Sequence, residues 1–213
     1  MKPALRQRAL ELGFDDCRVT SADAPESAAR FRQWLADGRH GEMAWLERTA
    51  QKRTDPQLVL PGARSILTLA ASYHHPGWPA ADHCPPSPVA RYARYTDYHD
   101  VLGERLKQLA EFMRQLGGPA TRSLWYVDTG PLLERDLAQR AGLGFIGKHT
   151  NLVSRRLGNW FFLGEIITTL DLAPDPPERN RCGSCNRCLQ ACPTAAITAP
   201  FQLDARRCLS YLT

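Results

Sequence analysis

The sequence predicts a mixed α/β (α+β) protein, with a body at residues 1–172 and a small cysteine-rich domain at residues 182–213. Three observations support this fold class. Stretches with helical apolar spacing alternate with short apolar runs typical of buried strands. A segment with three prolines, residues 173–181, reads as a linker. The chain of 213 residues is 43% hydrophobic, which is enough to bury one substantial core beside a small appendage.

The first half of the chain predicts three helices and one strand. Residues 1–16 (MKPALRQRALELGFDD) predict an amphipathic helix and lack the uninterrupted apolar region of a signal peptide. Residues 27–37 and 42–50 predict two helices, separated by glycines that break the chain between them. Residues 64–73 (RSILTLAASY) predict a buried strand. The proline-rich residues 74–90 predict a loop.

The second half continues the alternation. Apolar residues recur at helical spacing over residues 97–118, and two glycines end this long amphipathic helix. Residues 122–128 predict a strand, and residues 131–142 predict a helix opened by proline in its first turn. Residues 160–170 (WFFLGEIITTL) predict a further strand.

The charge and hydropathy of the chain set limits on its location and partners. The formal net charge of +5 is modest, and such an arginine surplus more often reflects a solvated surface than an anionic partner. No run approaches the ~18 apolar residues that a membrane span needs. We therefore expect a cytoplasmic protein with reduced thiols and no membrane association.

Four cysteines lie close together in the stretch CGSCNRCLQACP. The spacing Cys182-x2-Cys185-x2-Cys188-x3-Cys192, followed by proline, matches the bacterial ferredoxin run for a 4Fe–4S cluster. In such a run three thiolates hold one cluster, and the fourth ligates another cluster in two-cluster proteins. Zinc sites usually separate two cysteine pairs by ~15–20 residues. The spacing therefore favours an iron–sulfur site.

Several other motifs are weaker. The glycines of residues 142–147 spell GxGxxG, but they follow a predicted helix, whereas a dinucleotide-binding fingerprint follows a strand. The same segment fails as a phosphate-binding loop because His149 stands where serine or threonine should hold magnesium. Asp97 and His99 suggest a cobalt-ligating box with its glycine one position late, or simply a helix cap and a surface residue. We expect the remote Cys17 and Cys84 to have no site role.

Five stretches resemble the bacterial epoxyqueuosine reductases. They are 38–56 (GRHGEMAWLERTAQKRTDP), 89–102 (VARYARYTDYHDVL), 127–152 (VDTGPLLERDLAQRAGLGFIGKHTNL), 182–197 (CGSCNRCLQACPTAAI) and 203–213 (LDARRCLSYLT). The resemblance covers nearly the whole chain. It implies a cobalamin-binding catalytic domain followed by a small, incomplete ferredoxin-like iron–sulfur domain. It also implies the last step of queuosine biosynthesis, the reduction of epoxyqueuosine to queuosine at the tRNA wobble position.

The resemblance assigns roles to particular residues. Asp128 corresponds to the proton donor, and with the resemblance we favour this role over the alternative that Asp128 merely caps the helix beginning near Pro131. For donation the carboxyl has to stay protonated, and we expect burial against the corrin to favour that form. A place at the end of a strand also suits a site in an α/β protein. The residues implied in cobalamin binding are Asp128, Arg53, Arg91, Lys148, Asn151 and Ser210.

The cysteines receive their ligand roles in the same way. Cys182, Cys185 and Cys188 are expected to hold one cluster, while Cys192 and Cys208 belong to the other. Seven cysteines, two of them remote, cannot supply the eight ligands of two 4Fe–4S clusters. We therefore expect a fragment that lacks a second cysteine run, or a chain whose missing ligands come from elsewhere.

The implied reaction needs two electrons and two protons and releases water. Cob(I)alamin would engage the epoxide and be re-reduced by the 4Fe–4S clusters, which an external donor such as a flavodoxin or ferredoxin supplies. The implied substrate is the tRNA anticodon stem-loop carrying epoxyqueuosine, bound by a monomer. Two other classes remain open: a reductive dehalogenase-like cobalamin enzyme, and a non-enzymatic iron–sulfur electron-transfer module without a corrin pocket near Asp128.

Overall fold

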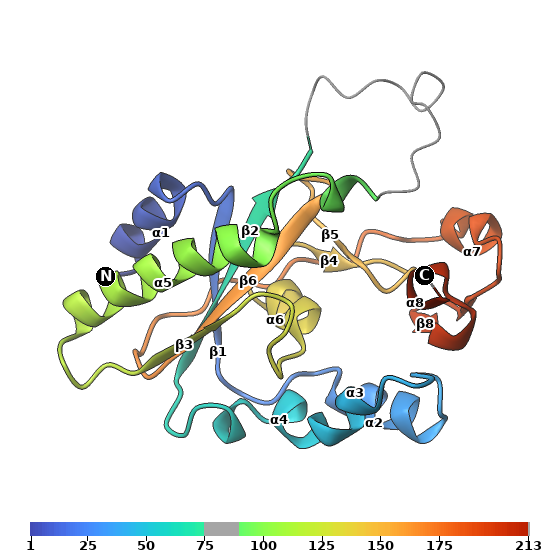
Figure 1. The fold of residues 1–213 in the computed structure, drawn as a ribbon, viewed down its shortest axis with the longest axis horizontal. Coiled ribbons are helices and arrows are strands. Elements are labelled where there is room, and N and C mark those ends of the chain that lie inside the picture. The colour runs from blue at the N-terminus through green and yellow to red at the C-terminus, as the bar shows by residue number, and fades with distance from the viewer. Residues whose placement is uncertain (75–89, 213) are drawn as a thin grey trace.

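A four-stranded sheet forms the centre of the protein, as seen in a computed structural model that describes residues 1–74 and 90–212 (Figure 1). The strands lie in the order β1 (Asp16–Ser21), β2 (Ser65–Ser72), β6 (Phe161–Thr168) and β3 (Ser123–Tyr126). Every neighbouring pair is antiparallel. The predicted mixture of helices and strands is confirmed, and the antiparallel sheet makes it an α+β rather than a doubly wound arrangement.

The two central strands are buried on both faces. In β2, Leu67 and Leu69 point to one face while Ile66 and Ala70 point to the other, and all four are fully buried. Leu67 lies opposite Ile166 of β6. A strand covered on both faces reads as a continuous apolar run, which explains why residues 64–73 were recognisable from sequence.

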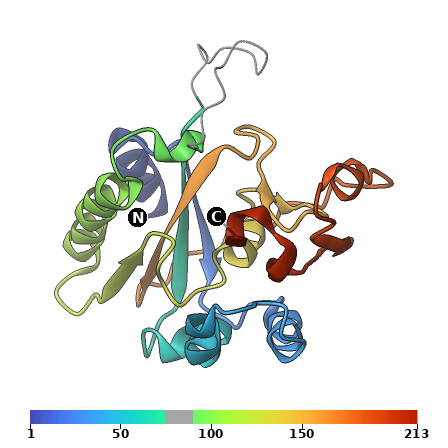
Figure 2. The ribbon, with the colours of Figure 1, turned by 45° about the vertical axis from the view of Figure 1, so that its right-hand side comes forward.

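Helices α1 (Lys2–Glu11) and α5 (Tyr98–Gly117) cover one face of the sheet (Figure 2). The apolar side of α5 packs with α1 and the strands into one core, because its apolar residues recur every three or four positions. The fully or nearly fully buried members of this core include Leu5, Ala9, Val19, Leu67, Leu69, Leu102, Leu106, Leu109, Met113 and Ile166. The carboxylate of Asp97 caps α5 by accepting a hydrogen bond from the His99 backbone N–H at 2.9 Å, so the cap interpretation of this pair is confirmed.

The opposite face is covered by the short helix α6 (Glu134–Arg140), whose Leu137 and Ala138 are fully buried. A small hairpin of β4 (Phe145–Ile146) and β5 (Leu152–Val153) follows it. The chain between β1 and β2 forms four short helical elements, visible along the lower edge of Figure 1. They are α2 (Ala28–Ala36), α3 (Ala44–Arg48), α4 (Ala50–Thr54) and the 3-10 turn η1 (Pro56–Leu58).

The segment at residues 173–181 is hydrogen-bonded to the body along its length. The Asp175 N–H donates to the Val19 carbonyl at 2.8 Å, and the Glu178 N–H donates to the Gln139 carbonyl at 3.2 Å. The amide of Asn180 donates to the Ile146 carbonyl at 2.7 Å. Although its prolines predict an irregular connection, the segment is fixed in place by strand, helix and hairpin contacts.

The cysteine-rich domain contains small elements only. They are α7 (Arg187–Ala191), β7 (Ile197–Ala199), β8 (Gln202–Leu203), the 3-10 turn η4 (Ala205–Arg207) and α8 (Leu209–Leu212). Residues 34–42 of the body receive this domain. The indole N–H of Trp34 donates to the Leu203 carbonyl at 2.6 Å, and the Ala205 N–H donates to the Arg39 carbonyl at 2.9 Å. The Tyr211 hydroxyl accepts from the Glu42 N–H at 2.8 Å.

Some elements differ from the expectations of the sequence. The helix expected over 131–142 begins only at Glu134, with Leu133 at its N-cap position, so the proline lies before the helix. The helix expected over 42–50 is two short helices that meet at Thr49. Strand β1 was not anticipated, because DCRVTS mixes polar and apolar residues at an edge of the sheet. No helix within the described ranges 1–74 and 90–212 is long and apolar enough to cross a membrane. Cys84 lies outside these ranges, whereas Cys17 is a buried core thiol.

Candidate functional site

Asp128 lies in the loop that joins β3 to α6, two residues after the strand ends. Its backbone has φ of 60°, in the left-handed region that non-glycine residues rarely adopt. The Tyr98 hydroxyl donates a hydrogen bond to Oδ2 of Asp128 at 2.9 Å. The loop therefore presents the carboxyl in one orientation, and strained backbone of this kind is often found at functional sites.

The structure decides between two expectations for Asp128. Helix α6 begins at Glu134 and has no side-chain cap, so Asp128 does not cap it and the cap alternative is wrong. The side chain of Asp128 is exposed in the described chain, and its expected burial against the corrin stays a prediction. Because the sheet is antiparallel, the preference of α/β proteins for sites at the carboxyl ends of parallel strands does not apply to Asp128.

Tyr98 is held by aromatic stacking at the start of α5. Its ring lies parallel to that of Phe162 in β6, with centroids 4.1 Å apart and planes 6° apart. Burial, followed by the hydrogen bond to Asp128, raises the pKa of Tyr98 far above its ordinary value. The phenol therefore stays protonated and acts as a fixed donor to the carboxylate.

Arg53, at the end of α4, is buried beneath the loop that carries Asp128. Its guanidinium donates to the Leu132 carbonyl at 3.0 Å and to the Thr49 hydroxyl at 2.9 Å, and it lies 5.2 Å from the centroid of the Trp45 ring. Burial lowers the pKa of Arg53, while the charges of Glu134 and Asp128 oppose that shift. Arg53 is thus an electrostatic neighbour of Asp128, and its Nε and Nη1 already donate hydrogen bonds to the chain.

Two buried carboxyl groups beside Asp128 were missed by sequence reasoning. Glu165 lies in the middle of β6 and is fully buried, and Glu134 is the first residue of α6. Burial, then the charge of Asp128, raises the pKa of Glu134 to about 7. Burial and the charge of Glu134 raise the pKa of Glu165 well above its ordinary value. The available signal was a lone glutamate inside the apolar run FFLGEIIT, since an unpaired buried charge is rare.

Arg91 lies against Trp160, in the group of aromatic rings that includes Tyr98, and not against Asp128. Its guanidinium carbon lies 4.3 Å from the centroid of the Trp160 ring, a cation–π arrangement. Trp160 stacks on Tyr73, and Tyr73 contacts Phe162, which carries the ring of Tyr98. A continuous series of rings therefore links Arg91 to the partner of Asp128.

Lys148 lies against the cysteine-rich domain. Its backbone N–H donates to Sγ of Cys182 at 3.4 Å. Its ammonium group donates to the Gly183 carbonyl at 2.9 Å and to Oδ1 of Asn186 at 2.8 Å. Lys148 therefore fixes the first turn of the cysteine run to the body of the protein.

The remaining predicted cofactor residues are exposed. Asn151 follows the β4–β5 turn, and its carbonyl accepts a hydrogen bond from the Gly147 N–H at 2.9 Å. Ser210 lies in α8. Within the described residues, neither side chain is hydrogen-bonded to Asp128. The structure thus places the charge of Arg53 near Asp128 and the backbone N–H of Lys148 against Cys182, but it does not bring all six predicted residues together.

The five cysteines of the C-terminal domain are free thiols. The Cys185 N–H donates to the Cys182 carbonyl at 3.0 Å, which closes a turn between the first two. Backbone N–H groups, that of Ile197 first, lower the pKa of Cys192 to about 7, and its Sγ accepts from the Ala196 N–H at 3.3 Å. Outside the undescribed residues 75–89 and 213, no three His, Cys, Asp or Glu side chains converge closely enough to hold a metal ion. The predicted cluster ligands therefore remain a prediction.

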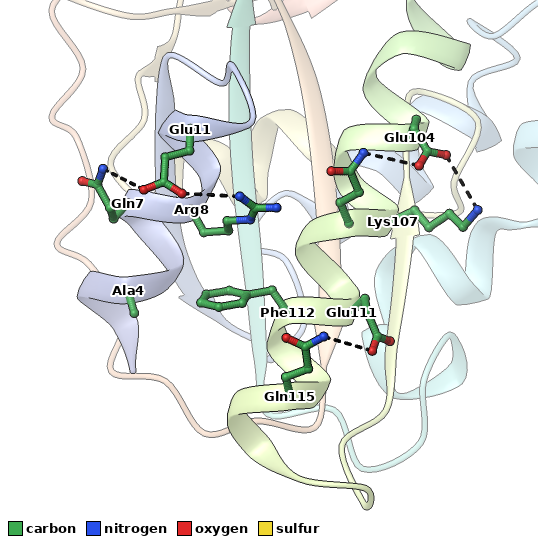
Figure 3. A pocket seen from close by; sticks show the side chains of 10 residues that line it. Ala4, Gln7, Arg8, Glu11, Glu104, Lys107, Glu111, Phe112 and Gln115 are labelled. Atoms are coloured by element: carbon green, nitrogen blue, oxygen red, sulfur yellow. Dashed lines mark hydrogen bonds and ion pairs between the residues drawn. The ribbon is translucent and has the colours of Figure 1, made fainter.

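An open groove of about 620 Å³ lies apart from this site, between α1 and α5 (Figure 3). Phe112 lies at its centre, while the charged and amide groups along its rim bond to neighbours on their own helix, as Arg8 does to Glu11. None of the predicted site residues lines it.

Comparison with known proteins shows that the chain contains an iron–sulfur domain. Residues 181–213 match a 4Fe-4S double cluster binding domain, so the chain carries an iron–sulfur domain on an α+β body. Residues 53–129 match the family described as "Epoxyqueuosine reductase QueG, DUF1730". The curated epoxyqueuosine reductase of Gloeobacter violaceus is 47% identical over 98% of this chain and 65% of its own length. The curated epoxyqueuosine reductase of Leadbetterella byssophila is 39% identical over 98% of this chain and 68% of its own length. The chain belongs to the epoxyqueuosine reductase family.

Solved structures agree with the sequence comparison. An epoxyqueuosine reductase crystallised with an epoxyqueuosine-modified tRNA-Tyr stem loop is 34% identical, with a TM-score of 0.84 over 99% of this chain and 56% of that one. A B12-dependent reductive dehalogenase shares the fold at a TM-score of 0.51 and 20% identity. The chain spans about two thirds or less of the length of the curated relatives that it matches.

Proposed function

We propose that this chain reduces epoxyqueuosine to queuosine in the anticodon loop of tRNA, using cobalamin and 4Fe–4S clusters. The observation that carries the proposal is 47% identity to a curated epoxyqueuosine reductase over nearly the whole chain, with Asp128 presented on a strained loop. The dehalogenase-like alternative rests on the fold alone, since the identity is 20%.

The chemistry of the exposed donors supports a corrin site. Cobalamin presents amide groups and one phosphate at its periphery, and these pair with amide, hydroxyl and guanidinium groups. Asn151 and Ser210 expose the first two, and the half-buried Arg91 carries a guanidinium beside the Trp160 ring. Because the polar groups of Arg53 and Lys148 already bind the chain, we assign both a positioning role. When bound, the cobalamin supplies the two-electron reducing chemistry.

The residues of this chain handle the proton. Removal of the epoxide oxygen as water consumes two protons, and Asp128 delivers one of them to that oxygen as the C–O bond breaks. The Tyr98 hydroxyl binds Oδ2 of Asp128, which orients the carboxyl. The exposed carboxyl becomes shielded from water only when ligands cover it, and that desolvation favours its protonated form.

Electrons would enter through the cysteine-rich domain. The soft thiolates of Cys182, Cys185 and Cys188 suit one 4Fe–4S cluster, and Cys192 and Cys208 would contribute to a second. The low pKa of Cys192, about 7, favours the thiolate form that binds iron. An external donor such as a flavodoxin or ferredoxin, acting on a monomer, would reduce the clusters.

The RNA partner follows from the reaction. A base in the anticodon loop is unstacked and accessible, so it can approach Asp128 without the opening of a duplex. Lysine and arginine outnumber acidic residues by 27 to 22, and contacts from that surplus to phosphates would make binding weaken as salt rises.

The test compares Asp128→Asn with Asp171→Asn, which changes an exposed carboxylate paired with Arg64. Each protein is reconstituted with iron, sulfide and cobalamin, and is given a chemical reductant and an anticodon stem-loop that carries epoxyqueuosine. We expect Asp128→Asn to keep the corrin spectrum and lose queuosine formation by a factor of at least ~100, since general acid catalysis contributes that much. Wild-type turnover by Asp128→Asn, or no corrin binding by any of the proteins, would contradict the proposal.

A further inference from the structure

Glu165 is the most unusual buried group of the described chain. It occupies the centre of the sheet, opposite Thr68 of β2 and Tyr126 of β3. Apart from the neighbouring Glu134 carboxyl, its carboxyl oxygens have no hydrogen-bond partner within residues 1–74 and 90–212, and the hydroxyl of Thr68 also lacks a partner there. An ionised carboxylate in such a place would lose its hydration without compensation, so Glu165 is held as the neutral acid.

Glu134 lies next to Glu165 and differs from it in access. It is only partly buried as a residue, although its Oε1 is closed to solvent and its carboxyl pairs with that of Glu165. Its charge acts directly on Glu165, and the charge of Asp128 acts on both. Three carboxyl groups therefore share one site between the sheet and the loop at residues 127–133.

The cations around the site do not neutralise three carboxylates. Arg53 and Arg135 face Glu134, but the Arg135 guanidinium is exposed and donates to the Thr150 carbonyl at 2.9 Å. Tyr126 lies opposite Glu165 on β3, and burial keeps its phenol neutral. With Arg53 as the single buried cation of the described site, full ionisation would leave uncompensated negative charge. At least one proton has to reside there.

We propose that Glu134 and Glu165 form a proton-holding carboxyl pair that returns a proton to Asp128 after each turnover. Glu134 is the exchanging member, because it is less buried than Glu165 and follows directly on the loop that carries Asp128. Glu165 is a positioning residue that stays neutral and keeps a second charge out of the sheet. The use of the proton rests on the proposed function, whereas the presence of the proton does not.

The transfer is balanced and involves no change of oxidation state. Once Asp128 has given its proton to the departing oxygen, the O–H bond of Glu134 breaks and an O–H bond forms on Asp128. Glu134 is left ionised and takes a proton from water. The net charge of the site is the same before and after the transfer, because the negative charge moves from Asp128 to Glu134 until water reprotonates Glu134.

The first experiment measures the proton in the chain itself, without cofactor or RNA. Infrared spectra recorded with glutamate labelled by ¹³C at its side-chain carboxyl report the C=O stretch of a protonated acid, which a carboxylate lacks. We expect a protonated glutamate that persists to higher pH than an ordinary glutamate and disappears in Glu165→Gln. A second protonated glutamate should titrate near pH 7 and disappear in Glu134→Gln.

Glu111→Gln is the matched control, because Glu111 is exposed, ion-paired with Arg114 and expected to be ionised throughout. The bands of protonated glutamate in this variant should equal those of the parent chain. Absence of any protonated glutamate at pH 7 in the folded parent chain overturns the proposal, and this result does not require either variant to fold.

The second experiment tests the use of the proton in the reconstituted protein. We expect Glu134→Gln to lower kcat about tenfold with KM for the RNA unchanged, and to remove an ionisation near pH 7 from the pH profile of kcat. An unchanged profile overturns the role in turnover. Failure of the parent protein to reduce epoxyqueuosine, with both infrared bands present, would instead refute the proposed function alone.

Discussion

The Tyr98 hydroxyl lies 2.9 Å from Oδ2 of Asp128 and joins the first turn of α5 to the loop after β3. The ring of Tyr98 stacks on that of Phe162, so the Tyr98 hydroxyl stays in place if the loop that carries Asp128 moves. The orientation of Asp128 is thus set by Tyr98 of α5, the helix that precedes β3 in the chain.

Replacing Tyr98 by phenylalanine should slow queuosine formation. The substitution keeps the stack on Phe162 and removes one hydrogen bond to a carboxylate, which contributes about 1.5–3 kcal/mol. We expect kcat to fall at least about tenfold with cobalamin binding unchanged. Tyr92→Phe is the control, since it removes a hydroxyl from the ring that packs edge-on against Tyr98. Equal rates for the two variants would show that the hydrogen bond does not orient Asp128.

Two glycines at the edge of the docked domain provide a matched pair. Gly38 and Gly41 have φ of 64° and 63°, so alanine is strained at both, by about 1 kcal/mol. A Cβ at Gly41 would also lie 2.6 Å from the Tyr211 hydroxyl, whereas a Cβ at Gly38 meets nothing within 4 Å. We expect Gly41→Ala to cost about 1 kcal/mol more in urea unfolding, because the Tyr211–Glu42 hydrogen bond is lost. It should also speed proteolysis within residues 182–213, and equal behaviour of the two variants would argue against this docking contact.

The stability of the chain should fall as the pH rises from about 4.5 to 7. The folded state keeps a proton on Glu134 up to about pH 7, whereas the unfolded state releases it near 4.5. Below pH 4.5 both states are protonated, and above it the unfolded state is increasingly favoured, by up to about 3 kcal/mol for this group. Glu165 extends the loss to higher pH. Urea titrations at several pH values should show this slope, and Glu134→Gln should flatten it while Glu111→Gln does not.

Lys148→Met should weaken the iron–sulfur domain rather than the corrin site. Methionine preserves much of the apolar stem but releases the Gly183 carbonyl and the Asn186 amide, at about 1 kcal/mol for each lost hydrogen bond. We expect lower iron and sulfide content after reconstitution and faster loss of the cluster in air. The control is Lys107→Met, on the exposed side of α5. Intact clusters together with lost cobalamin would return Lys148 to the cofactor-binding role implied by the resemblance.

Much of the fold was predictable because its strongest elements carry local signals. The long helix α5 and the strands β2 and β6 have clear apolar patterns, and each lies within two residues of its expected bounds. Strand β1 was not predictable in this way, because its place depends on pairing with β2, fifty residues later. The start of α6 depended on the path of the loop at residues 127–133, which leaves Pro131 outside the helix.

The site was less predictable than the fold. Family resemblance pointed to Asp128, but nothing in the local sequence indicates that Tyr98, thirty residues earlier, binds it. Lys148 matched the family pattern, yet its actual partners come from the cysteine run through tertiary contact. Glu165 carried a local signal, a charge within an apolar strand, but its partner Glu134 is brought to it only by the packing of α6 on the sheet.

The pairing at the centre of the sheet also sets the order in which the chain can fold. Ser65 at one end of β2 lies opposite Thr168 at one end of β6, roughly a hundred residues apart in sequence. Such a distant pairing closes a long loop before its contacts become favourable, which slows folding. During synthesis β2 has only its edge partner β1 until β6 has left the ribosome, so one side of this apolar strand stays unpaired while most of the body is made.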